Sequence, residues 1–231
     1  MSNTGADVGT EPTDGRSTRW DSHKAERRDL ILDAAIGAIN ELGADIGVSE
    51  IAGRADLPRS VVYRIFKDRN DLDEQLRARI VQMLMRDLAP TLAPEGAVDA
   101  SISRAVDTYV NWIVAYPRLH AFLGKGSPKH RTSGSRVVTG AKTAIAVQLT
   151  GLLLAVARKQ PSAYQIAEPL AFGLVGLVDA SVNRWLNNPS SGVTSEQLAQ
   201  FLKRSVWHLL DVNMRAVDIV IEPSTPIAAL V

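Results

Sequence analysis

Apolar residues recur along this chain at the three- and four-residue spacing of amphipathic helices, without the alternation typical of strands. Proline and glycine interrupt the pattern where helices would end. The pattern therefore predicts an all-α fold of about nine helices. We expect a first helix over 27–43, two short helices beginning near 49 and 58, and six later helices over about 70–88, 97–116, 118–123, 135–159, 162–187 and 194–215.

Capping residues mark three of these starts. Ser49 and Asn70 are both good N-cap residues for the helices that follow them. Thr194, followed three residues later by Gln197, has the pattern of a capping box. We therefore expect the last helix to begin sharply at 194.

Residues 48–67 carry the apolar positions of a helix-turn-helix. Ile51 and Ala55 lie four residues apart on one face of the first short helix. Leu57 follows the turn, and Pro58 lies in the first turn of the second helix, where a missing N–H costs little. The inner face of that second helix is formed by Val62, Ile65 and Phe66.

The remaining side chains of the second helix face outward and suit duplex DNA. Arginine and lysine pair with phosphates, arginine also binds guanine edges, serine hydrogen-bonds bases or phosphates, and valine contacts thymine methyls. Between 54 and 69 there are five basic residues and two acidic ones, a local charge of +3 in a chain of net charge +1. Ordinary amphipathic helix pairs with solvated basic faces share this spacing, so the motif alone leaves that alternative open. The outward residues are Arg59, Ser60, Val61, Tyr63, Arg64 and Lys67.

The stretch from about 24 to 72 resembles the DNA-binding domain of the TetR family of transcriptional regulators. The similarity rests on the run RRDLILDAAIGAINELG at 27–43, the V-S start at 48, and the Y-R-x-F run with Tyr63, Arg64 and Phe66. The resemblance implies that Arg59, Ser60, Val61 and Arg64 lie on the recognition helix. It also implies phosphate contacts from Tyr63, from Ser49 at the start of the second helix, and from Arg69 at the head of the fourth. Asp56 replaces the usual glycine of the turn, where the backbone often needs positive φ.

Composition narrows the class of protein further. The chain has 231 residues, of which 45% are hydrophobic and 22% charged, enough for a sizeable core. It has no cysteine, and its four histidines show no metal-ligand spacing, so we predict neither metal nor cofactor. The sequence motifs of common hydrolases, metalloproteases and phosphate-binding loops are absent, so we do not expect an enzyme. The apolar runs at 149–157 and 170–178 are too short to span a membrane and are better explained as buried helices.

We divide the chain into four parts. Residues 1–21 are rich in Gly, Ser, Thr, Asp and Pro and are expected to form a disordered arm. Residues 22–69 form the DNA-binding domain, 70–222 an effector-binding and dimerisation domain, and 223–231 an irregular tail. The absence of cysteine and of a signal-peptide pattern fits a cytoplasmic protein.

The expected effector site lies among the helices between 97 and 187. An apolar cavity with a few polar anchors suits a small-molecule effector. For any single aromatic residue here, an ordinary core position is the more common explanation. The candidates are Tyr109, Trp112, Tyr116, His120, Phe122, Gln148, Asp179 and Trp185.

The helices near 162–187 and 194–215 are candidates for a homodimer interface. The first carries Phe172, Gly176 and Ala180 at four-residue spacing with Gly173 beside them, and the second carries Leu198, Leu202, Trp207, Leu209 and Leu210. These stripes also suit an internal core. In the TetR family the corresponding helices form a four-helix bundle across the two-fold axis, which would place two recognition helices roughly 34–36 Å apart or somewhat more.

The sequence thus predicts a regulator that binds a palindromic operator as a homodimer and is released by an apolar small molecule, acting most often as a repressor. Two other interpretations remain: a helical protein-interaction module that uses the helix-turn-helix shape without DNA, and a small helical enzyme.

Overall fold

The computed structural model describes residues 15–125, 135–160 and 163–230. Within these residues the chain forms nine α-helices and no strand, so the predicted all-α fold is confirmed. The helices are α1 (Gly15–Leu42), α2 (Val48–Arg54), α3 (Arg59–Ile65), α4 (Arg69–Leu88), α5 (Val98–Ala115), α6 (Pro117–Gly124), α7 (Arg136–Val156), α8 (Tyr164–Leu186) and α9 (Ser195–Arg215). Short 3-10 turns follow α4, α7 and α8, and another lies in the C-terminal tail.

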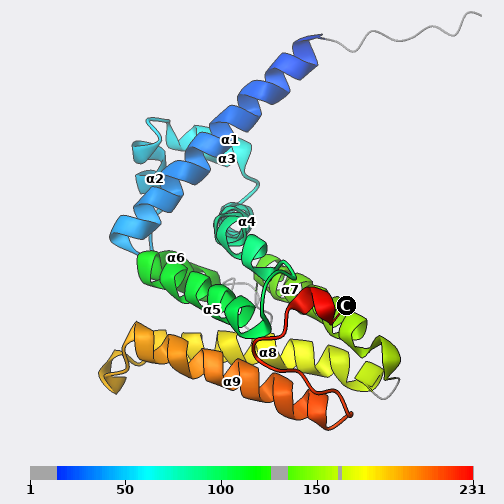
Figure 1. Cartoon of the computed structure of the whole chain (residues 1–231). Helices are drawn as coiled ribbons and strands as arrows, with labels where there is room; N and C mark the ends of the chain where they lie inside the picture. The colour runs from blue at the N-terminus through cyan, green and yellow to red at the C-terminus, as the bar shows by residue number, and fades with distance from the viewer. Residues whose placement is uncertain (1–14, 126–134, 161–162, 231) are drawn as a thin grey trace, which may run out of the picture.

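The helices form two connected groups (Figure 1). Helices α2 and α3 pack beside the C-terminal half of the long helix α1, whose other end projects away from the molecule. We call α1, α2 and α3 the head. Helix α4 leads from the head into the second group, where α7 packs on α8, and α8 lies beside α9. The head and the second group are therefore joined by α4 and by the contact of α1 with α6.

Local chemistry explains where several helices end. Gly43 terminates α1 with φ +99°, a conformation that glycine adopts without steric cost. Asp56 has φ +50° in the turn between α2 and α3, as its position predicted. The capping box of α9 is confirmed, because the Thr194 hydroxyl accepts from the Gln197 N–H and the Gln197 side chain accepts from the Thr194 N–H.

Three expected boundaries are wrong. Helix α1 begins at Gly15 rather than near 27, so residues 15–21 are helical rather than part of a disordered arm, whose remainder lies outside the described residues. No proline interrupts the chain between 15 and 42, so α1 can extend backward without a break. Ser49 lies inside α2, which Gly47 caps through its extended backbone. Helix α4 is capped by Asp68 instead of Asn70, because the Asp68 carboxylate accepts from the Asp71 N–H at 2.9 Å.

The boundary predicted at 69/70 does not separate two cores. Ile31 of α1, Leu76 of α4 and Leu119 of α6 are all fully or almost fully buried in one apolar cluster. That cluster reaches Leu202 in α9, while a second cluster around Met214 joins the ends of α7, α8 and α9. Packed side chains therefore connect the second group directly to the head.

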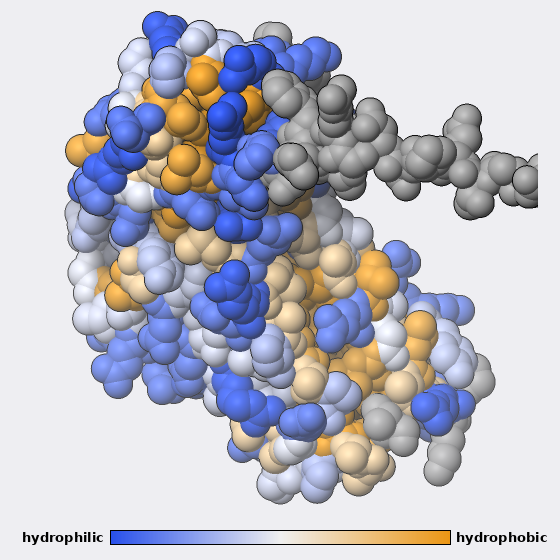
Figure 2. All heavy atoms as spheres, turned by 90° about the horizontal axis from the view of Figure 1, so that it is seen from above, coloured by the Kyte–Doolittle hydropathy of each residue, from blue (hydrophilic) through white to orange (hydrophobic). Residues whose placement is uncertain are grey.

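Helices α7 and α8 are less buried than the apolar runs predicted. Both are long and apolar enough to cross a membrane by length and composition, and only 11% and 28% of their most apolar windows are buried within the chain. Each also carries charged residues, among them Lys142 on α7 and Asp179 on α8, which pair with each other. Apolar residues reach the surface between charged patches (Figure 2), and Val147 and Phe172 are among the exposed ones. Contiguous exposed apolar residues mark surfaces that contact partners or membranes in other proteins.

The C-terminal tail is docked rather than loose. The N–H groups of Val98 and Asp99 at the start of α5 donate to the carbonyls of Thr225 and Pro223, and the Ile227 N–H donates to the Gly96 carbonyl. Ile227 lies in a short 3-10 turn, Ile227–Ala229, and is buried. These backbone bonds hold the tail, which sequence patterning classed as irregular, against the base of α5. In Figure 1 it runs back from α9 toward α5 and α7.

A buried arginine joins α4 to α6. Arg77 is 2% exposed, donates to the Glu74 carboxylate at 2.7 Å and to the Lys125 carbonyl at 2.8 Å, and lies over the Phe122 ring at 5.1 Å. The other Glu74 oxygen accepts from the Ser135 hydroxyl at the start of α7. One ion pair thus connects three helices of the second group.

We expect Arg77→Met to lower the free energy of unfolding by about 3 kcal/mol, because it leaves the Glu74 charge without its buried partner. Urea denaturation of the purified protein measures the change. Arg79→Met is the matched control, since Arg79 pairs with Asp33 at the surface and should contribute under about 1 kcal/mol. Equal losses in the two variants would contradict the role assigned to Arg77.

Candidate nucleic-acid interface and ligand cavity

The turn between α2 and α3 fixes which face of α3 is exposed. The Leu57 N–H donates to the Ala52 carbonyl and the Asp56 N–H to the Gly53 carbonyl, which closes the turn. Pro58 then caps α3, and Val62 and Phe66 point into the core at 1% and 2% exposure. The opposite face of α3 is therefore turned to solvent.

Most of the predicted DNA-contacting residues lie on this exposed face. Val61 is half-buried, and the others on α3 and beside it are exposed: Arg59, Ser60, Tyr63, Arg64 and Lys67. Ser49 is exposed near the start of α2. The Arg59 guanidinium donates to the Tyr63 hydroxyl at 2.9 Å and lies over the Tyr63 ring at 5.3 Å. This stacking holds a cation and an aromatic hydroxyl together on the outer face of α3.

Two of the five basic residues counted in the motif are engaged elsewhere. Arg69 donates to the Asp73 carboxylate and to the Ile46 carbonyl, both at 2.8 Å, so it fastens α4 to the loop before α2. Burial raises the pKa of the Asp73 carboxyl, and Arg69 opposes that shift. Arg54 forms an ion pair with Glu41 at the end of α1, and its hydrogen bonds lower the pKa of the Glu41 carboxyl. A DNA phosphate that contacts Arg69, as predicted, would thus compete with Asp73 and the Ile46 carbonyl for the same guanidinium.

Several basic side chains fasten the head to the second group. Arg118 of α6 donates to the carbonyls of Asn40 and Glu41 at the end of α1. Lys125 pairs with Asp45 at 2.7 Å in the loop before α2. Sequence patterning missed these contacts, since a long-range pair between α6 and the α1–α2 loop leaves no periodic signal.

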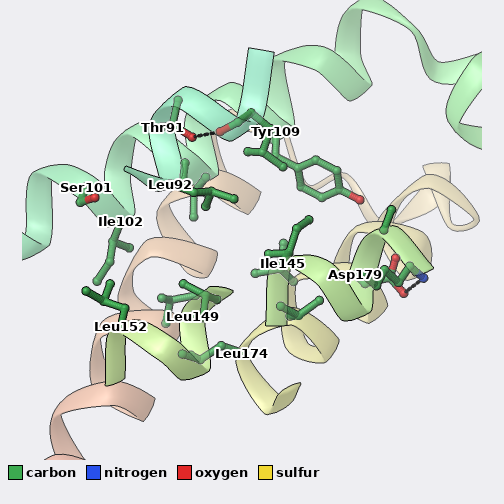
Figure 3. Close-up of a pocket in the computed structure, with 18 of the residues that line it drawn as sticks. Thr91, Leu92, Ser101, Ile102, Tyr109, Ile145, Leu149, Leu152, Leu174 and Asp179 are labelled. Atoms are coloured by element: carbon green, nitrogen blue, oxygen red, sulfur yellow. Dashed lines mark hydrogen bonds and ion pairs between the residues drawn. The ribbon is translucent and has the colours of Figure 1, made fainter. Parts of the chain in front are cut away.

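A cavity of about 300 Å³ lies within the second group (Figure 3). It is bounded by α4, α5, α7, α8 and α9, with the end of α6 and the C-terminal tail completing the wall. Leucine, isoleucine, valine and alanine dominate the lining, and Leu92, Ile102, Ile145, Leu149, Leu152 and Leu174 are among the side chains drawn in the figure. Its volume is at the lower end of the roughly 300–1,000 Å³ typical of small-molecule sites.

Polar groups of the cavity gather around Tyr109 and Asp179. The Tyr109 hydroxyl lies 3.3 Å from His120 Nε2, and Lys142 Nζ lies 2.7 Å from the Asp179 carboxylate. Burial, with a contribution from Asp179, raises the pKa of the Tyr109 hydroxyl. Burial lowers the pKa of the His120 imidazole, which therefore favours its neutral form. The cluster holds two neutral hydrogen-bonding groups beside one internally paired set of charges.

The structure places three of the eight predicted pocket residues in the cavity wall, namely Tyr109, His120 and Asp179. That they contact an effector stays a prediction. The other five lie elsewhere. Trp112 is buried against Tyr116, Phe122 lies under Arg77, Gln148 is exposed on α7, and Trp185 donates to the Val193 carbonyl. The four aromatic ones pack or bond within the fold, as aromatic residues at helical spacing commonly do.

The cavity also contains residues that sequence reasoning missed. Lys142 was not predicted, because nothing in the sequence around a lysine on an apolar helix indicates that it pairs with Asp179. Ile221, Ile227 and Leu230 follow α9, in a segment without helical periodicity. Among the residues that the structure describes, no group of three or more His, Cys, Asp or Glu side chains is placed to hold a metal ion.

Comparison with known proteins bears on the fold and the head. No family model matches the chain. It is 29% identical over 202 residues, 87% of this chain and 84% of the relative, to an uncharacterized HTH-type transcriptional regulator of Mycobacterium tuberculosis. It is also similar to the crystal structure of a TetR-family transcriptional regulator from Streptomyces coelicolor, with a TM-score of 0.66 and 19% identity, over 89% of this chain and 86% of that one. The chain has the fold of the TetR family of transcriptional regulators.

The resemblance inferred from the motif at 24–72 is therefore confirmed, and it extends over the whole helical architecture. The multidrug binding protein EbrR, solved in complex with malachite green, is also similar to this chain, with a TM-score of 0.56 and 18% identity. That similarity covers 80% of this chain and 98% of EbrR. These comparisons establish the TetR fold and leave the operator and the ligand of this chain to be derived from its own residues.

Proposed function

We propose that this protein is a cytoplasmic transcriptional regulator, acting as a repressor, that binds a palindromic DNA operator as a homodimer and is released by a small molecule. The observation that carries the proposal is the outer face of α3. There Arg59, Tyr63 and Arg64 are exposed on a helix that Val62 and Phe66 fix to the core. A rigid helix with exposed arginine suits the major groove.

Exposed apolar residues on α8 and α9 support the homodimer. Phe172 of α8 is 40% exposed, and Phe201 and Val212 of α9 are 46% and 63% exposed. Gly173, Gly176 and Ala180 lie on the same exposed side of α8. Leu198 and Leu202 are different, because the structure buries both in the core, so their expected part in the interface is wrong. A symmetric pairing of α8 and α9 would cover the exposed residues and set two α3 helices on one face.

The polar contacts between the head and the second group support regulation by a ligand. His120 and Leu123 of α6 line the cavity, while Arg118 and Lys125 of the same helix region hold the end of α1 and the loop before α2. A ligand that favours another position of α6 or α4 would shift the head through these contacts. The shift is limited by the difference in ligand affinity between the two states, typically about 1–3 kcal/mol. The complex of EbrR with malachite green supports a small-molecule effector for this cavity.

Selection of bound sequences from random duplex DNA, with the purified full-length protein, tests the proposal. We expect a palindrome with half-sites about one helical turn apart or somewhat more, because two α3 helices related by a two-fold axis read both halves. A single unrepeated half-site would contradict the dimer. Failure to enrich any sequence at moderate salt would contradict operator binding.

Salt dependence separates DNA recognition from use of the helix-turn-helix as a protein-interaction module. Affinity for the selected duplex should fall by roughly 0.9 log unit per log of salt for each phosphate neutralised. A slope near zero would favour the interaction module.

A further inference from the structure

The two ends of the cavity differ in chemistry. Figure 3 places Tyr109 and Asp179 on one side of the cavity and Ile102 and Leu152 on the opposite side. Ile102 lies near the start of α5, about two helical turns, or roughly 10 Å, before Tyr109. The cavity therefore runs along α5 from an end that is apolar apart from the Ser101 hydroxyl to a polar one.

The polar end contains hydrogen-bonding groups without net charge. Lys142 and Asp179 neutralise each other at 2.7 Å, and burial lowers the pKa of His120, so its neutral form is favoured. A ligand carboxylate would meet Asp179 as well as Lys142, and a ligand ammonium would meet Lys142 as well as Asp179, so either ion leaves the polar end with one unit of net charge. A hydroxyl or carbonyl can instead exchange hydrogen bonds with Tyr109 and the ion pair at no such cost.

The C-terminal tail closes the apolar end. Ile221, Ile227 and Leu230 line the cavity and belong to the apolar cluster that also contains Val98 and packs against Ile102 and Leu152. Backbone hydrogen bonds with the residues before and at the start of α5 fix this segment, residues 221–230, which we call the C-terminal strap. The strap thus lies opposite Tyr109 along the axis of the cavity.

We propose that the cavity binds an uncharged amphiphile, with one hydrogen-bonding head group at Tyr109 and an aliphatic chain whose length the C-terminal strap limits. This inference specifies the effector and rests on the proposed ligand-responsive function. The apolar wall provides a favourable environment for the chain, and the paired charges at the other end select against charged heads.

The head group is tested by calorimetric titration of the full-length protein with decanol, decanoate and decylammonium, without DNA. We expect decanol to bind at least about tenfold more tightly than either ion, because only the ions leave the polar end with a net charge. Tyr109→Phe should weaken decanol by about fivefold, the typical effect of one lost hydrogen bond. Equal or tighter binding of either ion would overturn the assignment of an uncharged head, and no binding of decanol would overturn the ligand class.

The strap is tested with n-alkanols from hexanol to hexadecanol. Affinity should rise by about fourfold per methylene until the chain reaches the strap, and then stop rising. Leu230→Ala, at a half-buried position, should move this limit to a longer alkanol, and Ile227→Ala provides a second variant at the same end. Val220→Ala is the matched control, because Val220 lies beside the strap, is 61% exposed and does not line the cavity.

An unchanged limit in both strap variants, each shown by thermal unfolding to be folded and still able to bind hexanol, would overturn the role of the strap. Tyr109→Phe should lower the affinity for every alkanol without changing the chain length at which affinity stops rising. One alkanol series therefore tests the two ends of the cavity separately. All these titrations omit DNA, so they succeed or fail independently of operator selection. Alkanol binding without operator binding would refute the regulator while leaving the ligand assignment intact.

Discussion

Replacing Arg59 and Arg64 together with alanine is expected to weaken binding to the selected operator by about a thousandfold or more. Each arginine can form a two-pronged contact with a guanine edge or a phosphate, and such a base contact typically discriminates by about 1–3 kcal/mol. Because a symmetric dimer makes every contact twice, the four lost contacts add across the two half-sites. Gel-shift or fluorescence anisotropy titration at fixed salt measures the loss.

The control for this variant removes the same charge elsewhere. Arg86→Ala with Arg158→Ala changes two exposed arginines outside the head. It should alter operator affinity by no more than the general loss of positive charge does. Both double variants should melt at the temperature of the unmodified protein, since all four side chains are exposed. If the control were as damaging as the Arg59 and Arg64 pair, α3 would not be the reading helix.

The fold was predictable because its signals are local. The Thr194 and Gln197 capping box, the positive φ of Asp56 and the apolar spacing of Val62 and Phe66 each lie within a few residues of what they determine. The exposed face of α3 follows from the same spacing, because burying Val62 forces Arg59 and Tyr63 outward. Most of the candidate DNA interface could therefore be placed from the sequence.

The cavity was less predictable because its walls come from segments far apart in the chain. Aromatic residues such as Trp112 attracted attention, yet the cavity is lined mostly by aliphatic side chains that look like any other core residue. Lys142 can be recognised as part of the polar end of the cavity only from its contact with Asp179, 37 residues later. The strap has no periodicity to indicate that it folds back on α5.

The charge count of the motif shows the same limit. Arg54 and Arg69 add to a basic cluster in the sequence, but the structure pairs them with Glu41 and Asp73. The basic side chains on and just after α3, Arg59, Arg64 and Lys67, are exposed, and so is Arg54, but Arg54 is held by its ion pair with Glu41. Local composition thus overstates the charge that faces DNA.

Gly176→Glu is expected to convert the proposed homodimer to monomer, weakening self-association by about a thousandfold or more. A Cβ at Gly176 would meet no atom within 4 Å in the chain itself, so the substitution fits the isolated fold. It should even favour the helix by a fraction of 1 kcal/mol, since glycine is among the poorest helix formers. In a symmetric interface of α8 and α9, the same glutamate would be buried twice without a partner, close to its own copy. Analytical ultracentrifugation measures the association.

Gly140→Glu provides the matched control, because Gly140 is a helical glycine on α7 whose added Cβ also meets nothing within 4 Å. That variant should remain dimeric and bind the operator normally. The Gly176 variant should keep its thermal stability and its affinity for decanol but lose binding to the full palindrome, since a monomer contacts one half-site at a time. Dissociation caused by the Gly140 substitution alone would move the interface from α8 to the exposed apolar face of α7. Retention of the dimer in both variants would mean that Phe172, Phe201 and Val212 are covered by something other than a second copy of this chain.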